Sequence, residues 1–173
     1  MRLVDCSFDA HSGAILDILN DTIANSTALY DYVPRPPESM VGWFRTKAEG
    51  RFPVIGAESD QGELLGFASY GPFRPWPAYK YTVENGIYIQ RDHRGQGLGK
   101  LLMNELIRRA HAQDYHLIVA GIDAENAASI SLHQSLGFAH AGTIRHAGFK
   151  FGRWLDLAFY ELRLKTPLNP HDG

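Results

Sequence analysis

Residues 90–100 read Gln-Arg-Asp-His-Arg-Gly-Gln-Gly-Leu-Gly-Lys, and this stretch decides the fold of the 173-residue chain. An alternating apolar run, Tyr81 to Ile89, leads into it and predicts a strand, while the apolar spacing from Leu101 to Ala112 predicts a helix. A glycine-rich turn at such a junction exposes backbone N–H groups at a helix N-terminus, where the helix dipole also favours negative charge. The stretch therefore predicts an anion-binding loop.

Two common phosphate motifs do not fit this loop. A Walker A motif needs Gly where Arg94 stands and Ser or Thr where Leu101 stands, and the dinucleotide motif needs Gly where Lys100 stands. The pattern that fits is Arg94-x-x-Gly97-x-Gly99, which resembles the pyrophosphate loop of the GNAT N-acetyltransferases. The alternative is a connector that binds no ligand. We disfavour it because three alternating glycines destabilise the start of a helix, a cost that is expected only where the glycines serve a binding role.

Length and composition indicate one folded domain. Hydrophobic residues make up 45% of the chain and charged residues 21%, which is enough for a core and argues against disorder. We expect a single catalytic domain over residues 1–165, followed by a polar C-terminal tail over residues 166–173.

Charge and apolar patterning argue against several classes of partner. A net charge of −2 with scattered Lys and Arg argues against nucleic-acid binding. No apolar run approaches the length of a membrane span, which is about 18 residues. The segment Met1–Asp5 lacks the features of a signal peptide, and the single Cys6 fits a reducing compartment. We therefore expect a cytoplasmic protein, and the eight histidines show no spacing that predicts a metal site.

Periodicity and turn residues divide the chain into alternating elements. Proline and aromatic residues make stiff loops of 29–37 and 72–79, and glycines punctuate a loop at 147–153. Gly137 stands where a helix C-cap glycine belongs. Strands are predicted at 3–6, 52–57, 64–71, 81–89, 116–122, 138–143 and 154–164, and helices at 9–25, 38–48, 101–112 and 127–136.

Three further blocks extend the resemblance over most of the chain. They are Tyr81–Ile89, Asn126–Phe138 and Gly148–Asp156. With the glycine loop, they resemble the phosphinothricin N-acetyltransferase branch of the GNAT superfamily, which includes enzymes acting on methionine sulfoximine and methionine sulfone. The resemblance implies the α/β (α+β) GNAT fold, with a mixed central sheet of about seven strands flanked by about four helices. It also implies acetyl-CoA as cosubstrate, a small-molecule amine as acceptor, and a homodimer.

The loop and the strand before it are the expected cofactor site. The pyrophosphate of acetyl-CoA needs backbone donors, which the loop can supply, and the resemblance implies that the strand exposes backbone groups to the pantetheine arm. The strand residues can pack in the core at the same time. The residues concerned are Ile87, Tyr88, Ile89, Arg94, Gly95, Gln96, Gly97, Leu98, Gly99 and Lys100.

Glu84 is the candidate general base. Acetyl transfer needs a neutral amine, whereas an amino-acid ammonium is protonated at pH 7. Glu84 is the only acid in an apolar and neutral strand, where desolvation would raise the pKa of its carboxyl group toward the working pH. The resemblance places the base at the same position. The alternative is an outward-facing surface glutamate.

Three residues of the Asn126–Phe138 block are candidates near the thioester. His133 stands where many acetyltransferases have a tyrosine acid, so it can act as a general acid or only contact the cofactor. A thiolate with a pKa near 8–9 leaves with little help, which favours the contact. Asn126 can bond the pantetheine amide or cap the following helix, and Ser129 is a weaker candidate of the same kind.

Arg74 is the expected partner of a substrate carboxylate, because a guanidinium pairs with a carboxylate through two hydrogen bonds. The alternative is a solvated loop arginine. Other residues expected beside the substrate are Pro75, Trp76, Glu84, Asn85, Gly86, Tyr30 and Lys150. Lys150 can belong to the site of its own subunit, to the site of the partner subunit or to the dimer interface.

These observations favour an acetyl-CoA-dependent N-acetyltransferase acting on the α-amine of phosphinothricin, methionine sulfoximine or methionine sulfone, in detoxification. One alternative is an N-acetyltransferase for another small amine or a peptide N-terminus. A cationic acceptor would need several acidic side chains near the site, and the loops Pro72–Tyr79 and Gly148–Arg153 contain none. The other alternative is a non-catalytic acyl-CoA sensor. The presence of Glu84 argues against it, because a sensor needs no general base.

Overall fold

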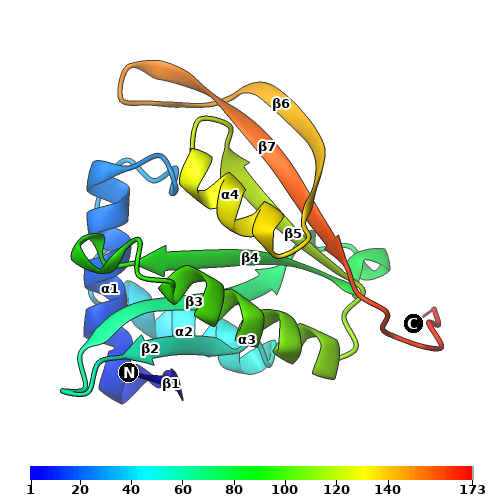
Figure 1. The fold of residues 1–173 in the computed structure, drawn as a ribbon, viewed down its shortest axis with the longest axis horizontal. Helices are drawn as coiled ribbons and strands as arrows, with labels where there is room; N and C mark the ends of the chain where they lie inside the picture. The colour runs from blue at the N-terminus through cyan, green and yellow to red at the C-terminus, as the bar shows by residue number, and fades with distance from the viewer. Residues whose placement is uncertain (173) are drawn as a thin grey trace.

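The computed structural model describes residues 1–172 and shows a seven-stranded sheet with helices on both faces (Figure 1). The strand order across the sheet is β1-β2-β3-β4-β5-β7-β6, and two 3-10 turns flank β4. The elements along the chain are β1 (Arg2–Asp5), α1 (Phe8–Asn25), α2 (Ser39–Glu49), β2 (Val54–Glu58), β3 (Leu64–Pro72), β4 (Thr82–Ile89), α3 (Leu98–Ala112), β5 (Leu117–Asp123), α4 (Ala127–Ser135), β6 (Ala139–Lys150) and β7 (Arg153–Arg163).

The predicted set of seven strands and four helices is confirmed, with two informative differences in their limits. Helix α3 begins at Leu98 rather than Leu101, because Gly97 adopts a left-handed conformation and its carbonyl accepts the first helical bond from Leu101. The expected loop at 147–153 is mostly strand, since β6 continues to Lys150 and only a tight turn separates it from β7.

All neighbouring strands are antiparallel except β4 and β5, which are parallel and pair over only three residues each. Thr82–Glu84 pair with Leu117–Val119, and beyond this point the two strands diverge (Figure 1). After the divergence β4 remains paired with β3, and β5 remains paired with β7. The divergence opens a gap in the middle of the sheet.

Two apolar clusters hold the helices on opposite faces of the sheet. Helix α3 contributes an apolar stripe to the larger cluster, including Leu102, Met103 and Leu106, which are fully buried. Helix α1 contributes Ile15 and Leu19 to the smaller cluster, together with Phe67 of β3. Each cluster buries the apolar face of a helix, and this burial stabilises the fold by about 25 cal/mol per Å² of apolar surface. Packing therefore fixes α1 and α3 relative to the gap.

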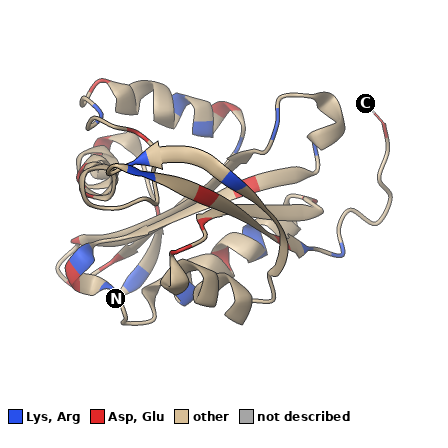
Figure 2. Cartoon of the chain, turned by 90° about the horizontal axis from the view of Figure 1, so that it is seen from above, with Lys and Arg blue, Asp and Glu red and all other residues tan. Residues whose placement is uncertain are grey.

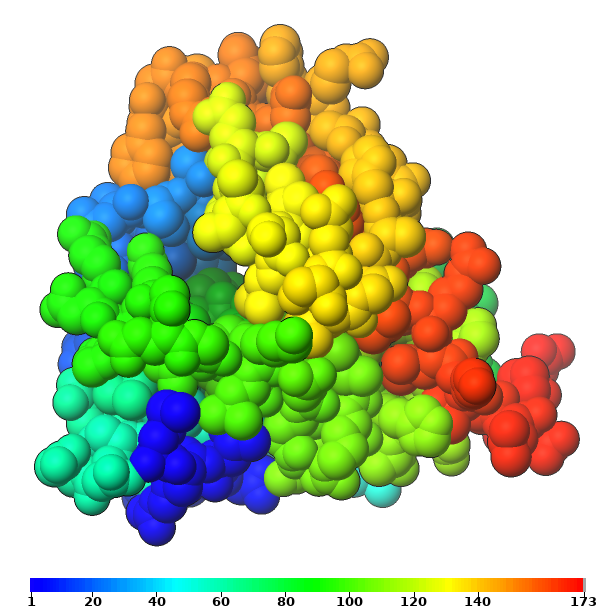
Figure 3. All heavy atoms as spheres, viewed as in Figure 1, coloured from blue at the N-terminus to red at the C-terminus, as the bar shows by residue number. Residues whose placement is uncertain are grey.

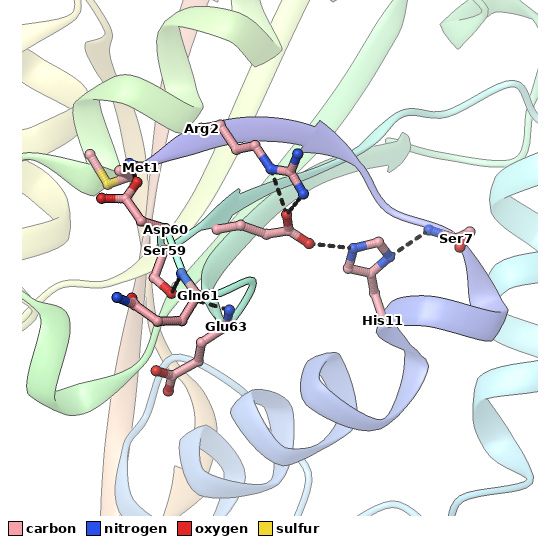
Figure 4. A network of polar contacts seen from close by, with 9 residues as sticks. Met1, Arg2, Ser7, His11, Ser59, Asp60, Gln61 and Glu63 are labelled. Atoms are coloured by element: carbon pink, nitrogen blue, oxygen red, sulfur yellow. Dashed lines mark hydrogen bonds and ion pairs between the residues drawn. The ribbon is translucent and has the colours of Figure 1, made fainter.

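A polar network fastens β1 and α1 to the end of β2 (Figure 4). The carboxylate of Glu58 accepts from Arg2 Nη2 at 2.8 Å and lies 3.1 Å from His11 Nε2. The Ser7 N–H donates to His11 Nδ1 at 3.0 Å, so the proton is on Nε2, which donates to Glu58. The hydrogen bonds from His11 and Arg2 hold the pKa of Glu58 below its ordinary value.

The start of the expected C-terminal tail is packed. Thr166 is buried; its hydroxyl donates to the carbonyl of Tyr115 at 2.6 Å, and its carbonyl lies 2.9 Å from His116 Nδ1. The ordered part of the chain therefore extends past residue 165.

The loop between α1 and α2 is held by the far end of β6. Lys150 is buried, and its ammonium donates to the carbonyls of Ile23, Ser26 and Leu29 at 2.6–2.9 Å. These carbonyls belong to the last turn of α1 and the residues after it, where a helix dipole favours a cation. Lys150 thus acts on the backbone of its own chain.

We expect Lys150→Met to lower the free energy of unfolding by about 2–4 kcal/mol, because three buried carbonyls lose a charged donor. Urea denaturation measures this directly. Lys165→Met, at an exposed position, is the matched control. Equal stability of the two variants would contradict the role given to Lys150.

Candidate active site

The glycine loop presents free backbone donors at the start of α3. Gly95 and Gly97 have φ of +74° and +82°, which other residues rarely adopt. No side chain caps α3, and the N–H groups of Leu98, Gly99 and Lys100 precede the first helical hydrogen bond. These groups are available to an anion.

Gly99 has a second reason to be glycine. A Cβ at this position would lie 3.0 Å from Leu132 Cδ2, so its absence lets α3 approach α4 closely. The close approach makes one wall of a groove of about 520 Å³. Figure 3 shows the hollow between the start of α3 and α4. The groove is lined by residues 87–89, 93–95, 97–100, 126, 128, 129, 131, 132 and 135, with residues 22, 26 and 28 from the α1 side.

The groove contains nearly all of the residues predicted to hold the cofactor. Gln96 is the exception within the loop, and its side-chain amide donates to the carbonyl of Asp92 at 3.3 Å. Arg94 is exposed and donates to the carbonyl of Ile89 at 3.2 Å. His93 and Lys100 add two more side chains that suit phosphate groups.

A second, smaller cavity occupies the gap between β4 and β5. It shares Ile87, Tyr88 and Asn126 with the groove, so the two spaces adjoin. The residues that line it are 27, 28, 30, 85–88, 120–123, 126, 129, 133 and 157. The short pairing of the two strands is therefore what creates this space.

Glu84 is not among the residues that line this cavity but lies next to it, because the pairing of β4 with β5 ends at Glu84 and its neighbours Asn85 and Gly121 line the space. Its carboxylate occupies space left by a glycine, because a Cβ at Gly121 would lie 3.0 Å from Glu84 Oε1. Burial raises the pKa of Glu84, and the positive charge of Arg74 opposes this rise. A partly buried carboxylate with a raised pKa is suited to accept a proton near neutral pH.

His133 is buried, with both ring nitrogens engaged. Nδ1 lies 2.8 Å from the carbonyl of Ser129, which can only accept, so Nδ1 carries a proton. Nε2 lies 3.0 Å from Asn85 Nδ2, which donates to it. Burial lowers the pKa of His133, which favours this neutral form.

Asn85 is fixed by the same arrangement. Its amide nitrogen also approaches Met103 Sδ at 3.6 Å, and its Oδ1 is buried without a partner in residues 1–172. Asn126 accepts from the Ser129 N–H at 3.1 Å, so it caps α4 while lining both spaces.

The predicted substrate residues are divided between the cavity and its surroundings. Tyr30, Asn85 and Gly86 line the cavity, while Arg74 and Lys150 do not. The Arg74 guanidinium lies 4.3 Å from the Phe73 ring centre, and Nη1 donates to the Phe73 carbonyl at 2.8 Å. Pro75 and Trp76 are exposed on the same loop, outside the cavity.

Several lining residues gave no signal in the sequence. Thr22, Ser26 and Ala28 come from the end of α1, far from the motif blocks, and Asp123 and Leu157 come from β5 and β7. Their place depends on how α1 packs and where β5 diverges, so only the tertiary structure reveals them.

Comparison with known proteins identifies this arrangement. The sequence matches the Acetyltransferase (GNAT) family over residues 16–138. The chain belongs to this family. It is 46% identical over 150 residues to the L-methionine sulfoximine/L-methionine sulfone acetyltransferase of Pseudomonas aeruginosa, with 87% of each chain covered. It is 34% identical to the phosphinothricin N-acetyltransferase of Streptomyces viridochromogenes, covering 93% of this chain and 87% of the relative.

A solved structure supports the same assignment. The GNAT superfamily phosphinothricin acetyltransferase from Sinorhizobium meliloti, in complex with acetyl-CoA, superposes with a TM-score of 0.93 at 32% identity. The match covers 98% of this chain and 91% of that one. The expected GNAT fold and N-acetyltransferase class are therefore confirmed.

Other expected features concern charge, metals and membranes. Lys and Arg are interspersed with Asp and Glu over the elements (Figure 2). Within residues 1–172, no group of three His, Cys, Asp or Glu side chains is placed to hold a metal ion. None of the helices in this range is both long and apolar enough to cross a membrane.

The hydrogen bonds of His133 predict a definite NMR signature for this GNAT protein. We expect the neutral Nδ1–H tautomer between pH 6 and 8, because its carbonyl partner requires that proton and burial disfavours the imidazolium. Long-range ¹H–¹⁵N spectra with His133→Gln for assignment would measure it. A ring that titrates near the ordinary histidine pKa would contradict this assignment.

Proposed function

We propose that this protein transfers acetyl from acetyl-CoA to the α-amine of a small amino-acid analogue. The observation that carries the proposal is the placement of Glu84, a partly buried carboxylate at the border of a cavity that adjoins the glycine-loop groove. The names of the relatives support methionine sulfoximine, methionine sulfone and phosphinothricin as acceptors, and detoxification as the role.

The groove suits acetyl-CoA on its chemistry. The backbone N–H groups at the start of α3 would bind the pyrophosphate, and Arg94 and Lys100 add positive charge. The β4 stretch Asn85–Ile89 has no partner strand on the β5 side, so its backbone groups there can bond the pantetheine amides. When bound, acetyl-CoA supplies an activated acetyl thioester.

Glu84 removes a proton from the substrate ammonium, directly or through a water, and leaves a neutral amine that can attack a carbonyl carbon. Unpaired backbone N–H groups of β4 after Glu84 are placed to stabilise the developing oxyanion, where one such donor is typically worth about 3 kcal/mol. His133 serves as a cofactor contact rather than an acid, because Nε2 has no proton to give. The C–S bond of the thioester would then break with CoA leaving as a thiolate, which needs little help because such a thiol has a pKa of about 8–9.

Arg74 is the proposed partner of the substrate carboxylate. Its positive charge acts on the Glu84 carboxylate, which supports a place for Arg74 near the same substrate. Its existing hydrogen bond is to the carbonyl of its neighbour Phe73, at an exposed position, and can be exchanged for a carboxylate at small cost.

A homodimer is the proposed assembly, and the β6–β7 hairpin is the proposed interface. Four of its large apolar side chains are 46–57% exposed, namely Ile144, Phe149, Phe151 and Trp154. Isolated apolar side chains are common on surfaces, but this many on one hairpin mark an association surface.

Two other functions remain as alternatives to this proposal. Acetylation of another small amine or a peptide N-terminus would use the same groove and Glu84 with a different acceptor. A non-catalytic acyl-CoA sensor would bind acetyl-CoA without turnover, and the buried carboxylate argues against it.

The substrate panel of methionine sulfone, methionine sulfoximine and phosphinothricin tests the proposal. Purified protein with acetyl-CoA should release CoA with at least one of them. Glu84→Gln should lower kcat by about 10²–10⁴-fold while acetyl-CoA binding, measured by calorimetry, is unchanged. No CoA release from any member would reject the substrate class, and an active Glu84→Gln would reject the base.

The pH profile gives an independent test of the Arg74–Glu84 coupling. Activity should fall as pH drops through the raised pKa of Glu84, because the protonated carboxyl cannot accept a proton. Arg74 lowers that pKa, so Arg74→Gln should move the acid limb of kcat/KM to higher pH. An acid limb that stays in place or moves to lower pH would show that the two charges are not coupled.

A further inference from the structure

The side chain of Tyr88 lies on the face of β4 that packs against α1. Tyr88 lines both the groove and the cavity, and because side chains alternate along a strand, its side chain shares the face of Glu84 and Gly86. The packing agrees, because the Tyr88 ring lies against Phe67 in the cluster on the α1 side, with ring centres 5.3 Å apart. Ile87 and Ile89 pack on the opposite face with α3.

The Tyr88 phenol folds back along β4 over Gly86. A Cβ at Gly86 would lie 3.1 Å from the Tyr88 hydroxyl oxygen, so the missing side chain makes room for the hydroxyl. The phenol therefore reaches toward Glu84, whose charge acts on it. Both residues 86 and 88 line the cavity between β4 and β5.

The hydroxyl has no hydrogen-bond partner within residues 1–172, yet it is not sealed in the core. Buried polar groups without partners are costly, and the only such side-chain nitrogen or oxygen in this range is Asn85 Oδ1. Tyr88 is partly exposed and lines the cavity, and its hydroxyl is not among the buried side-chain atoms without a partner, so water or a ligand can reach it. A packed ring with a free hydroxyl in a cavity is the arrangement of a ligand contact.

The phenol is a donor throughout the working pH range. Burial raises the pKa of Tyr88 to about 12, and the opposite charges of Arg35 and Asp31 shift it in opposite directions. The Arg35 guanidinium pairs with Asp31 at 3.2 Å, so this neighbouring charge is largely balanced.

We propose that the Tyr88 hydroxyl donates a hydrogen bond to an oxygen of the amine substrate and helps to select oxygen-bearing acceptors. The inference rests on the proposed function. The acceptor oxygen is that of the substrate carboxylate or that of its tetrahedral sulfur or phosphorus group, which present the same chemistry to a phenol. Glu84 and Tyr88 would then hold two ends of one substrate across Gly86.

Tyr88→Phe removes one oxygen and keeps the ring that packs on Phe67. With methionine sulfone, KM should rise by at least about tenfold, while kcat and the KM for acetyl-CoA change less than about threefold. Tyr115→Phe is the matched control, because its ring packs against Tyr70 and it does not line the cavity. Its kinetics should equal those of the unmodified protein.

Two further acceptors separate the possible oxygen sources. Methionine lacks the sulfone oxygens, and 3-(methylsulfonyl)propylamine lacks the carboxylate. The KM penalty of Tyr88→Phe should vanish with whichever compound lacks the contacted oxygen.

An unchanged KM for methionine sulfone in Tyr88→Phe, with an active unmodified protein, would overturn the role of Tyr88 alone. If the unmodified protein releases no CoA, the proposed function fails, and calorimetry with the same compounds decides the binding question. Equal affinity of the unmodified protein and Tyr88→Phe, or no affinity in either, would then overturn the Tyr88 inference too.

Discussion

The rest of the site depends on one constraint in the sheet, which is that β4 and β5 pair over three residues and then separate. A strand in the centre of a sheet ordinarily has both edges hydrogen-bonded, so an unpaired central edge must be compensated. Here each strand keeps its other neighbour, β3 or β7, and the freed edges face a cavity. The gap therefore places backbone donors and the Glu84 carboxylate around one space.

Glycines give this space its shape. Gly121 leaves room for the carboxylate of Glu84, Gly86 leaves room for the phenol of Tyr88, and Gly99 lets α3 approach α4. Within the site, Gly95 and Gly97 have a left-handed backbone, whereas these three glycines are required for close approach. The β6–β7 hairpin adds a remote support, because Lys150 fixes the loop that contributes Tyr30 to the cavity.

The sequence predicted the fold well because its signals are local. Strand alternation before residue 90, the helix after it and the glycine spacing are all read from short windows, and the structure has the same elements with limits shifted by a few residues. The predicted start of α3 was wrong because the left-handed conformation of Gly97 sets where that helix begins. The predicted end of β6 was wrong because the strand continues through Gly148.

The site was less accessible to sequence reasoning because it depends on side-chain direction. Lys150 lies in a motif block, yet its ammonium is directed to three carbonyls of its own chain. Tyr88 was expected to offer its backbone to the cofactor and its side chain to the core, and the sequence did not reveal that its ring folds back over Gly86. The tautomer of His133 depends on a carbonyl one helical turn away and on Asn85 of another element, which no linear pattern specifies.

The central claim is that the gap between β4 and β5 places an acetyl group beside Glu84. A crystal structure of the protein with acetyl-CoA tests it most directly. The account predicts the pyrophosphate on the N–H groups at the start of α3, the pantetheine arm along the unpaired edge of β4, and the acetyl group in the gap between Glu84 and His133. A cofactor that lies outside this gap, or an acetyl group separated from Glu84 by the sheet, would contradict it.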